Sequence, residues 1–351
     1  MKFVLIGCGG TAHSYATVIL GHPGMILSAV VDEYPDAARA FGHSFNCDSY
    51  TTLQDYAADN HFADWGIICT PGPNDPGIAD QLMRLGTNIF CETPFVQDSV
   101  TSEKMIDVSR TFGVQLTTGS RFRYLTDIAH ARELIQSGIL GRILVFEIDF
   151  RDMVDGGSCW DSRKDRGSYG ILFDRGNHAI DIARYFFGPL LRIRVEEDRR
   201  LRSQVVEFTV RIDMRTISGV IGTAQLSWKI KHACDDYIRI YGTRGTLCVG
   251  WKSSMYRLHG QDWIKFGEGY STLKALARRM ETMLDIATCN WVPETTAEDV
   301  HESVRAIEAA QRSLSTGHWI GLQPTPPELE MPRQVRNFTV LGPGKLLSPK
   351  T

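Results

Sequence analysis

The sequence lacks several features that mark particular classes of protein. Its eight cysteines form no CxxC pair, and neither the cysteines nor the ten dispersed histidines show the spacing of a metal site. No block of Lys or Arg stands out, because 38 basic residues are set against 41 acidic ones and the net charge is -3. We therefore expect no bound metal and no nucleic-acid partner.

Long apolar runs are missing as well. Only four apolar side chains stand between Lys2 and the first glycine, which is too short for the apolar region of a signal peptide. No later run approaches the roughly 20 apolar residues that a membrane-spanning helix needs, and no internal repeat with a period of about 20–50 residues is visible. We therefore expect a cytoplasmic protein with reduced cysteines and no membrane partner.

What is present is the composition of a globular protein, with 43% hydrophobic and 23% charged residues in a chain of 351. A chain of this length predicts about two domains. Over residues 1–120 short apolar strands alternate with helical patterns, which predicts a parallel sheet with helices on both faces. Over residues 121–322 strands of alternating polarity dominate and predict a mostly antiparallel sheet with one open face. Residues 323–351 are rich in proline and are expected to form an extended arm or tail.

A glycine-rich turn follows the strand expected at residues 2–6 and opens a helix. It fits the pattern G-x-G-x-x-G/A with Gly7, Cys8, Gly9, Gly10, Thr11 and Ala12. In this pattern the glycines allow a tight turn and a close approach of backbone to a pyrophosphate, which the helix N-terminus holds. A glycine-rich turn without a ligand is the alternative, but the next strand ends in an acidic residue, as a dinucleotide-binding site requires.

That residue is Asp32, placed 25 positions after Gly7. An acid about 20 residues beyond the first glycine binds the ribose hydroxyls of a dinucleotide. A carboxylate there repels a 2′-phosphate, so the expected cofactor is NAD rather than NADP. A solvent-facing aspartate in a turn is the alternative interpretation.

Two further strands end in polar residues. The segment CTPGPND carries Thr70 and Pro71, and the segment CETPF carries Glu92, Thr93 and Pro94. Ligands of open α/β sheets lie beyond the carboxyl ends of the strands. We therefore expect Glu92 and Thr93 to border the nicotinamide, Thr70 and Pro71 to bind the cofactor as well, and Pro94 to stiffen the second turn. A loop at a strand end without ligand contact is the alternative.

A candidate acid/base pair lies in the segment GSYGILFDRGNHAIDIARYFFG. Asp174 and His178 are four residues apart, so on a helix both side chains project from the same face. Asp181 lies on roughly that face as well. A carboxylate beside an imidazole can share proton transfer near neutral pH. A histidine that only makes a structural hydrogen bond is the alternative.

Taken together, these segments resemble the Gfo/Idh/MocA family, the glucose–fructose oxidoreductase and inositol dehydrogenase group. The resemblance spans residues 1 to about 322 and rests on GCGGTA, CTPGPN, GTNIFCETPF, RFRY, the segment containing Asp174 and His178, YGTRGTL and SVRAIEAAQRSLSTGHWI. It implies an α/β protein with an N-terminal Rossmann dinucleotide-binding domain. A C-terminal α/β domain follows, with a large, mostly antiparallel open-faced sheet. Such a sheet often joins subunits, so we expect a homo-oligomer.

The resemblance also implies an activity. Family members oxidise or reduce a hydroxyl or keto group of a sugar, nucleotide sugar or cyclitol with a nicotinamide cofactor. The family's D-x-x-x-H pair falls on Asp174 and His178, and its Glu-Lys-Pro segment falls on Glu92, Thr93 and Pro94. In the family the lysine touches the cofactor and the reacting oxygen, where an ammonium stabilises alkoxide charge. Threonine has a hydroxyl and no charge at this point.

Other departures accompany Thr93. Thr87 and Asn88 stand where family members often have Lys and His, and Asp75 stands where His is common. Charge for the reaction could come from Arg121, Arg123, Arg163, Lys164 or Lys229. The residues expected to hold the substrate are Arg121, Arg123, Tyr124, Trp160, Lys164, Asp174 and His178.

Three interpretations stay open. The first is an oxidoreductase in which Asp174 and His178 transfer protons without the lysine. The second is another reaction with the same cofactor, either an imine reduction or an epimerisation or elimination through a transient keto sugar. The third is an NAD-binding protein without catalytic activity.

Overall fold

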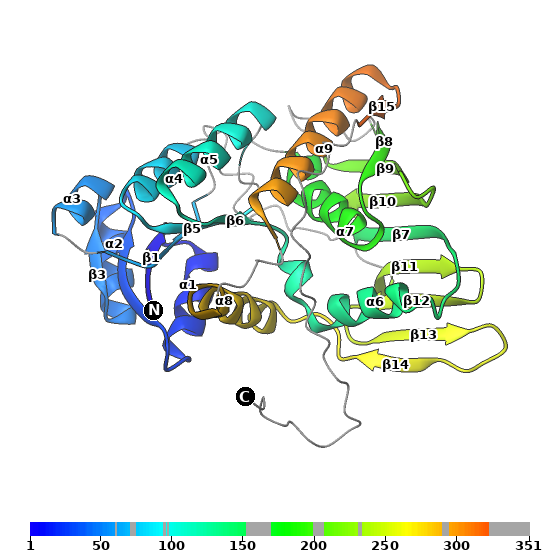
Figure 1. The fold of residues 1–351 in the computed structure, drawn as a ribbon, viewed down its shortest axis with the longest axis horizontal. Helices are drawn as coiled ribbons and strands as arrows, with labels where there is room; N and C mark the ends of the chain where they lie inside the picture. Colours follow the sequence, from blue (N-terminus) through cyan, green and yellow to red (C-terminus); the bar gives the residue numbers. More distant parts are fainter. Residues whose placement is uncertain are drawn as a thin grey trace.

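The computed structural model describes residues 1–59, 62–70, 75–93, 96, 98–151, 170–198, 207–230, 234–289 and 295–322. Its helices and strands form two α/β parts, each built around one β-sheet (Figure 1). We call the part with the N-terminal sheet the first layer and the other part the second layer. Some residues singled out by the sequence lie outside the described ones: Pro71, Pro94, Trp160, Arg163, Lys164 and the 323–351 segment.

The first sheet has six parallel strands in the order β3-β2-β1-β4-β5-β6. The strands are β1 (Lys2–Ile6), β2 (Ile26–Val31), β3 (Asp48–Tyr50), β4 (Trp65–Ile68), β5 (Asn88–Cys91) and β6 (Leu116–Thr118). Continuous apolar runs such as WGII in β4 are buried along their whole length, as strands covered by helices on both faces must be. The predicted parallel sheet is therefore confirmed.

Five helices connect these strands: α1 (Gly10–Leu20), α2 (Pro35–Phe45), α3 (Leu53–Ala58), α4 (Asp75–Arg84) and α5 (Ser99–Phe112). The strand order reverses between β1 and β4, so the crevice beyond their carboxyl ends is the ligand position of an open α/β sheet. The glycine-rich turn follows β1 and Thr70 follows β4, which places both at this crevice.

The second sheet has nine strands in the order β14-β13-β12-β11-β7-β10-β9-β8-β15. They are β7 (Ile143–Arg151), β8 (Leu190–Glu197), β9 (Thr209–Thr216), β10 (Ile221–Ser227), β11 (Asp236–Gly242), β12 (Gly245–Gly250), β13 (Ser254–Leu258), β14 (Ile264–Gly267) and β15 (Ile320–Gly321). Among the described strands of this second sheet, only β7 and β10 pair in parallel. The prediction of a large, mostly antiparallel sheet is confirmed.

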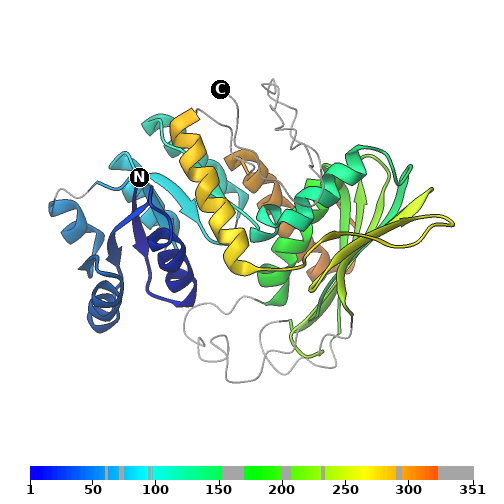
Figure 2. The same ribbon diagram turned by 90° about the horizontal axis from the view of Figure 1, so that it is seen from below.

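Helices cover one face of this second sheet. They are α6 (Thr126–Gln136), α7 (Asn177–Phe187) and α9 (Ala297–Thr316), which lie together on one side of the strands (Figures 1 and 2). Phe146, Ile148 and Ile212 are buried on that side, whereas Glu147 and Arg211 on the other side are exposed. The alternating strands therefore have one covered face and one open face.

Helix α8 (Thr272–Cys289) follows the second sheet in sequence but packs against the first layer, beside α1. Leu276, Met280 and Met283 of α8 are buried in the same cluster as Tyr15 and Phe90. The helix is thus part of the core that supports the carboxyl end of the first sheet.

The chain around the predicted acid/base pair departs from a plain helix. A π-helical turn, η2 (Leu172–Gly176), precedes α7, where the sequence pattern predicts one continuous α-helix. Such single turns inside helices are frequent at functional sites. A short 3-10 helix, η1 (Arg121–Tyr124), follows β6 on the facing side. Within the described residues, no helix combines the length and the apolar character that crossing a membrane requires.

Candidate active site

The glycine-rich turn has the geometry of a phosphate cradle. Gly7 has φ +94°, and a Cβ added there would come within 3.0 Å of the Thr70 side chain, so the position requires glycine. A Cβ added at Gly9 or Gly10 would meet nothing within 4 Å, which leaves open space above the turn. Gly9 caps α1, and no side chain of the described residues accepts from the helix N-terminus. These free N–H groups and the space above them fit the pyrophosphate of a dinucleotide.

Asp32 lies directly beside this turn. Its Oδ2 accepts a hydrogen bond of 2.7 Å from the Cys8 backbone N–H, and its Oδ1 accepts one of 2.9 Å from the Tyr34 N–H. Burial and the nearby Asp32 charge raise the pKa of the Cys8 thiol to about 12, so the thiol is protonated. A fixed carboxylate at the end of β2 fits the ribose of NAD. Thr11 is exposed and Ala12 is buried, as the pattern requires.

The turn after β4 is anchored to α4. Thr70 Oγ1 donates a hydrogen bond of 2.6 Å to Oδ1 of Asp75, whose residue is only 2% exposed. Asp75 therefore fixes the threonine that packs against Gly7.

Glu92 belongs to a buried network that joins four distant parts of the chain. Its Oε1 accepts from the Tyr15 hydroxyl at 2.5 Å and from Nη1 of Arg279 at 2.9 Å. Arg279 also donates to the Tyr15 hydroxyl at 2.6 Å and to the Gly119 carbonyl at 3.1 Å. The carboxylate thus ties the loop after β5 to α1, α8 and the end of β6.

The Arg279 side chain is fully buried between the rings of Phe90 and Tyr124, at 4.3 Å and 4.8 Å from their centroids. Burial alone would lower its pKa, but Tyr15 and Glu92 outweigh that effect and raise the pKa above its ordinary value. A permanent positive charge therefore stands beneath the loop that carries Thr93, although position 93 itself has none.

His178 is buried on α7 and faces the end of β6. Its Nδ1 lies 2.9 Å from Oγ of Ser120, and its ring packs edge-on against Phe122. Burial lowers the pKa of His178 well below its ordinary value, and the positive charges of Arg121, Arg175 and Arg279 lower it further. The imidazole is therefore neutral at neutral pH and can accept a proton.

Asp174 lies one turn before His178, on the π-helical turn. Its Oδ2 accepts a hydrogen bond of 3.2 Å from the Trp228 indole and lies 3.4 Å from Nε of Arg175. The side chain is 23% exposed, so the carboxylate is held in place and still reaches solvent.

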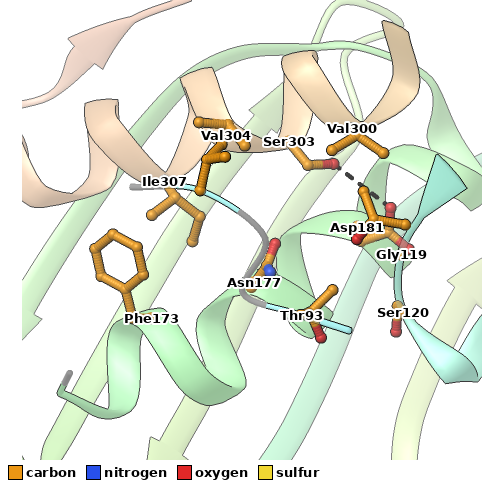
Figure 3. Close-up of a pocket in the computed structure, with 12 residues that line it drawn as sticks. Thr93, Gly119, Ser120, Phe173, Asn177, Asp181, Val300, Ser303, Val304 and Ile307 are labelled. Carbon is orange, nitrogen blue, oxygen red and sulfur yellow. Dashed lines mark hydrogen bonds between the residues drawn. The ribbon is translucent and has the colours of Figure 1, made fainter. Parts of the chain in front are cut away.

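A small cavity joins the loop after β5 to these groups. Figure 3 shows Phe173, Val304 and Ile307 on its apolar side and Gly119, Ser120 and Asp181 on the other, with Thr93 and Asn177 between them. Its volume of about 20 Å³ admits a water molecule and is too small for a sugar ring. Because Ser120 is bonded to His178, the cavity places Thr93 near the partner of the histidine.

The remaining predicted substrate residues lie in different surroundings. Arg123 is 2% exposed, and its guanidinium donates to Asp181 at 2.6 Å and 2.8 Å. Tyr124 is also buried, under Arg279. Lys229 is exposed and lies over the ring of Phe208. Arg121 directly follows Ser120, the hydrogen-bond partner of His178, in the sequence.

Sequence reasoning missed Arg279 and Ser120. Arg279 occupies the apolar stripe of α8, three residues after Leu276 and four after Ala275, both of which are buried. A charged residue at a position that helical periodicity assigns to the core is a signal that could have drawn attention to it. Ser120 ends the segment after β6 and carries no such signal. Within the described part of the chain, no three His, Cys, Asp or Glu residues gather as metal ligands would.

Comparison with known proteins agrees with this geometry. Residues 1–120 match the family model described as "Oxidoreductase family, NAD-binding Rossmann fold", and residues 128–248 match the GFO/IDH/MocA C-terminal domain. Inositol 2-dehydrogenase from Rhizobium meliloti is 25% identical over 254 residues, which are 71% of this chain and 75% of that protein. D-apiose dehydrogenase from Paraburkholderia graminis is 23% identical over 344 residues, 92% of this chain and 90% of the relative.

A solved structure shares the same fold across nearly the whole chain. It is an oxidoreductase from Agrobacterium radiobacter in complex with NAD⁺, L-tartaric acid and magnesium, with a TM-score of 0.82 and 19% identity. The match covers 92% of this chain and 98% of that one. The two family models, the crevice at β1 and β4 and the cradle at Gly9 lead to one conclusion: this chain belongs to the GFO/IDH/MocA family of oxidoreductases, and its cofactor is NAD.

Proposed function

We propose that this protein is an NAD-dependent dehydrogenase or reductase of a hydroxyl or keto group on a sugar or cyclitol, with His178 as the acid/base. The observation that carries the proposal is the neutral, buried imidazole of His178, held by Ser120 at the carboxyl end of the first sheet. The inositol and D-apiose dehydrogenases among the relatives support this substrate class.

The cofactor would lie across the crevice, with its pyrophosphate on Gly9 and Gly10 and its ribose on Asp32. When bound, its nicotinamide ring accepts a hydride from the substrate carbon or returns one. Residues 1–120 would bind the cofactor, and residues 121–322 would supply most of the substrate contacts.

His178 would move the proton of the reacting hydroxyl. In the tautomer whose Nδ1–H donates to Ser120 Oγ, Nε2 is free and would take the proton as the hydroxyl becomes a carbonyl and return it in the reverse direction. The neutral imidazole has a free ring nitrogen for the proton, and because burial and the nearby arginines lower its pKa, its protonated form is a strong acid that readily returns the proton to the substrate oxygen. Asp174, held by Trp228, would orient the substrate beside it.

We propose that the site departs from the family in how it supplies charge at the reacting oxygen. Thr93 would offer only a neutral hydroxyl, so the field of the cations around His178 would stabilise the developing negative charge. Arg279 contributes to this field from the interior of the protein, while its partner Glu92 holds the Thr93 loop in position.

The test is a panel of sugars and cyclitols incubated with the full-length protein and NAD⁺, followed by absorbance of NADH at 340 nm. A dehydrogenase accumulates NADH in proportion to oxidised product. Conversion of substrate without net NADH indicates the alternative route through a transient keto sugar. If NADH binds in a fluorescence titration but no compound is converted in either direction, the proposed dehydrogenase activity is wrong.

A further inference from the structure

The segment that follows β6 and helix α7 are joined by two pairs of side chains with the same spacing. In the first pair, Nδ1 of His178 lies 2.9 Å from Oγ of Ser120. Three residues further along each segment, Arg123 donates hydrogen bonds of 2.6 Å and 2.8 Å to the two carboxylate oxygens of Asp181. Residues three apart are neighbours on one face of an α-helix, so His178 and Asp181 face the same segment. The two pairs therefore act on one contact between η1 and α7.

The pair of Arg123 and Asp181 is enclosed by the interior of the protein. The two side chains are only 3% and 6% exposed. Oδ2 of Asp299 lies 3.6 Å from Nη1 of Arg123, and the guanidinium lies 5.1 Å from the centre of the Tyr185 ring. Figure 3 shows Ser303 of α9 pointing at Asp181, to which its hydroxyl donates at 3.5 Å. An arginine enclosed in this way is poorly placed to bind a substrate, and its effect on the reaction has to pass through its partner.

A charged pair in this place contributes direction rather than a large net stability. Both groups lose their hydration, and apolar residues of similar volume are often as stable as a buried ion pair. A planar guanidinium, however, meets the two oxygens of a carboxylate in one geometry. This double hydrogen bond fixes how α7 is rotated and how far it is shifted along η1. The single bond between Ser120 and His178 would leave the imidazole free to tilt.

From this arrangement we propose that Arg123 and Asp181 are positioning residues, whose paired hydrogen bonds hold α7 so that His178 faces the reacting oxygen. The inference rests on the proposed oxidoreductase function and extends it to two residues that touch neither substrate nor cofactor. His178 is the second residue of α7 and comes directly after the π-helical turn, so its place depends on what holds the first turns of this helix. A displacement of about 1 Å at a reacting group can lower a rate by about 10².

Two variants weaken the pair without removing a side chain. Asp181→Asn keeps the shape of the residue and removes its charge, and Arg123→Lys keeps the charge and loses the paired donors. We expect each to lower the single-turnover rate of NADH formation, with the best substrate of the panel, by about 10- to 100-fold while the Kd for NADH stays unchanged. If one variant fails to fold in urea denaturation, the other carries the test.

The chain offers a matched control in Asp127 of α6. Its residue is 4% exposed, as that of Asp181 is, and its carboxylate accepts hydrogen bonds from the Ser254 hydroxyl and the Gly269 N–H. Asp127→Asn therefore removes an equally buried charge that has no contact with His178 among the described residues. It should keep the wild-type rate, and a loss as large as that of Asp181→Asn would contradict the proposal.

A double-mutant cycle separates positioning from a general loosening of the fold. In a His178→Ala background the group to be positioned is gone, so adding Asp181→Asn should change the residual rate by less than about twofold. A loosened fold lowers the rate in both backgrounds. A loss of the same size with and without His178 overturns the proposal, and so does a wild-type rate in folded Asp181→Asn and Arg123→Lys proteins.

A measurement without substrate separates this inference from the function beneath it. Long-range ¹H–¹⁵N NMR spectra report the tautomer of each histidine ring, and the signals missing from His178→Ala protein belong to His178. We expect one fixed neutral tautomer in the wild type and in Asp127→Asn, and exchange between tautomers in Asp181→Asn. If no compound of the panel is converted in either direction, the proposed function fails. Identical His178 signals in the wild type and in Asp181→Asn overturn the positioning inference by themselves.

Discussion

The ion pair between Arg279 and Glu92 should make a large contribution to stability and a measurable one to the reaction. Replacing Arg279 with Met removes donors to Glu92, Tyr15 and Gly119 but keeps an apolar chain in the space between the two aromatic rings. Removing one partner of a buried pair costs about 3–5 kcal/mol. Because the Glu92 side chain is 21% exposed, we expect the low end of this range, about 3 kcal/mol.

A double-mutant cycle with Arg279→Met, Glu92→Gln and the double variant isolates the pair. The chain offers a matched control in the exposed pair of Arg110 and Glu298, whose side chains are 55% and 57% exposed. Urea denaturation should give a coupling above about 1 kcal/mol for the buried pair and about 0.2–1 kcal/mol for the exposed pair, which salt should weaken. Equal coupling free energies for the two pairs would refute the claim that burial makes the Arg279–Glu92 pair the stronger one.

The same variant tests the electrostatic part of the site. The Arg279 charge lowers the pKa of His178, so its removal should raise that pKa toward the ordinary value. The acid limb of the kcat/KM profile of Arg279→Met should therefore lie at higher pH than that of the wild type. An unchanged limb together with an unchanged unfolding free energy would show that Arg279 has no role at the site.

The remaining predictions concern other parts of the account. Because Asp32 would repel a 2′-phosphate, NADH should have a lower Kd than NADPH in fluorescence titrations. Asp32→Ser with an added arginine should reduce the difference between the two Kd values, and tighter binding of NADPH than of NADH by the wild type would contradict this prediction. Thr93→Lys should retain NADH binding and raise turnover of inositol or glucose; if neither this turnover nor that of the native substrate changes, position 93 does not face the reacting oxygen. Below pH 6.5 His178 takes up a proton in the unfolded chain but not in the folded protein, so lowering the pH by one unit lowers the unfolding free energy by up to about 1.4 kcal/mol. In urea denaturation below pH 6.5, the unfolding free energy of His178→Asn should depend less steeply on pH than that of the wild type. Light scattering should give at least twice 39.3 kDa, since the open sheet face is predicted to join subunits.

The first layer of the fold follows from local patterns in the sequence. Short apolar strands, the turn at Gly7 and the acid at Asp32 obey rules that act within a few residues, and their arrangement was predicted. The short strand β3 and helix α3 were not, because three- and six-residue elements carry too little periodicity. The hairpin of β13 and β14 was missed, and the parallel pairing of β7 with β10 follows no local pattern.

The contacts of the site depend on long-range packing. His178 meets Ser120 across 58 positions, and Glu92 meets Arg279 across 187. Sequence spacing predicted that Asp174 and His178 share a helix but could not predict the π-helical turn between them or their separate partners. Whether a polar residue such as Arg279 is buried depends on which surfaces α8 covers, and this is decided by the assembled fold.

The central claim is that His178 transfers the proton of a reaction for which NAD is the cofactor. Its most direct test compares wild-type and His178→Ala protein in two assays, a fluorescence titration with NADH and single-turnover formation of NADH at 340 nm with the best substrate of the panel. We predict unchanged NADH affinity and a rate lower by about 10²–10⁴. A variant that turns over at nearly the wild-type rate, or one that loses NADH binding, would contradict the assignment.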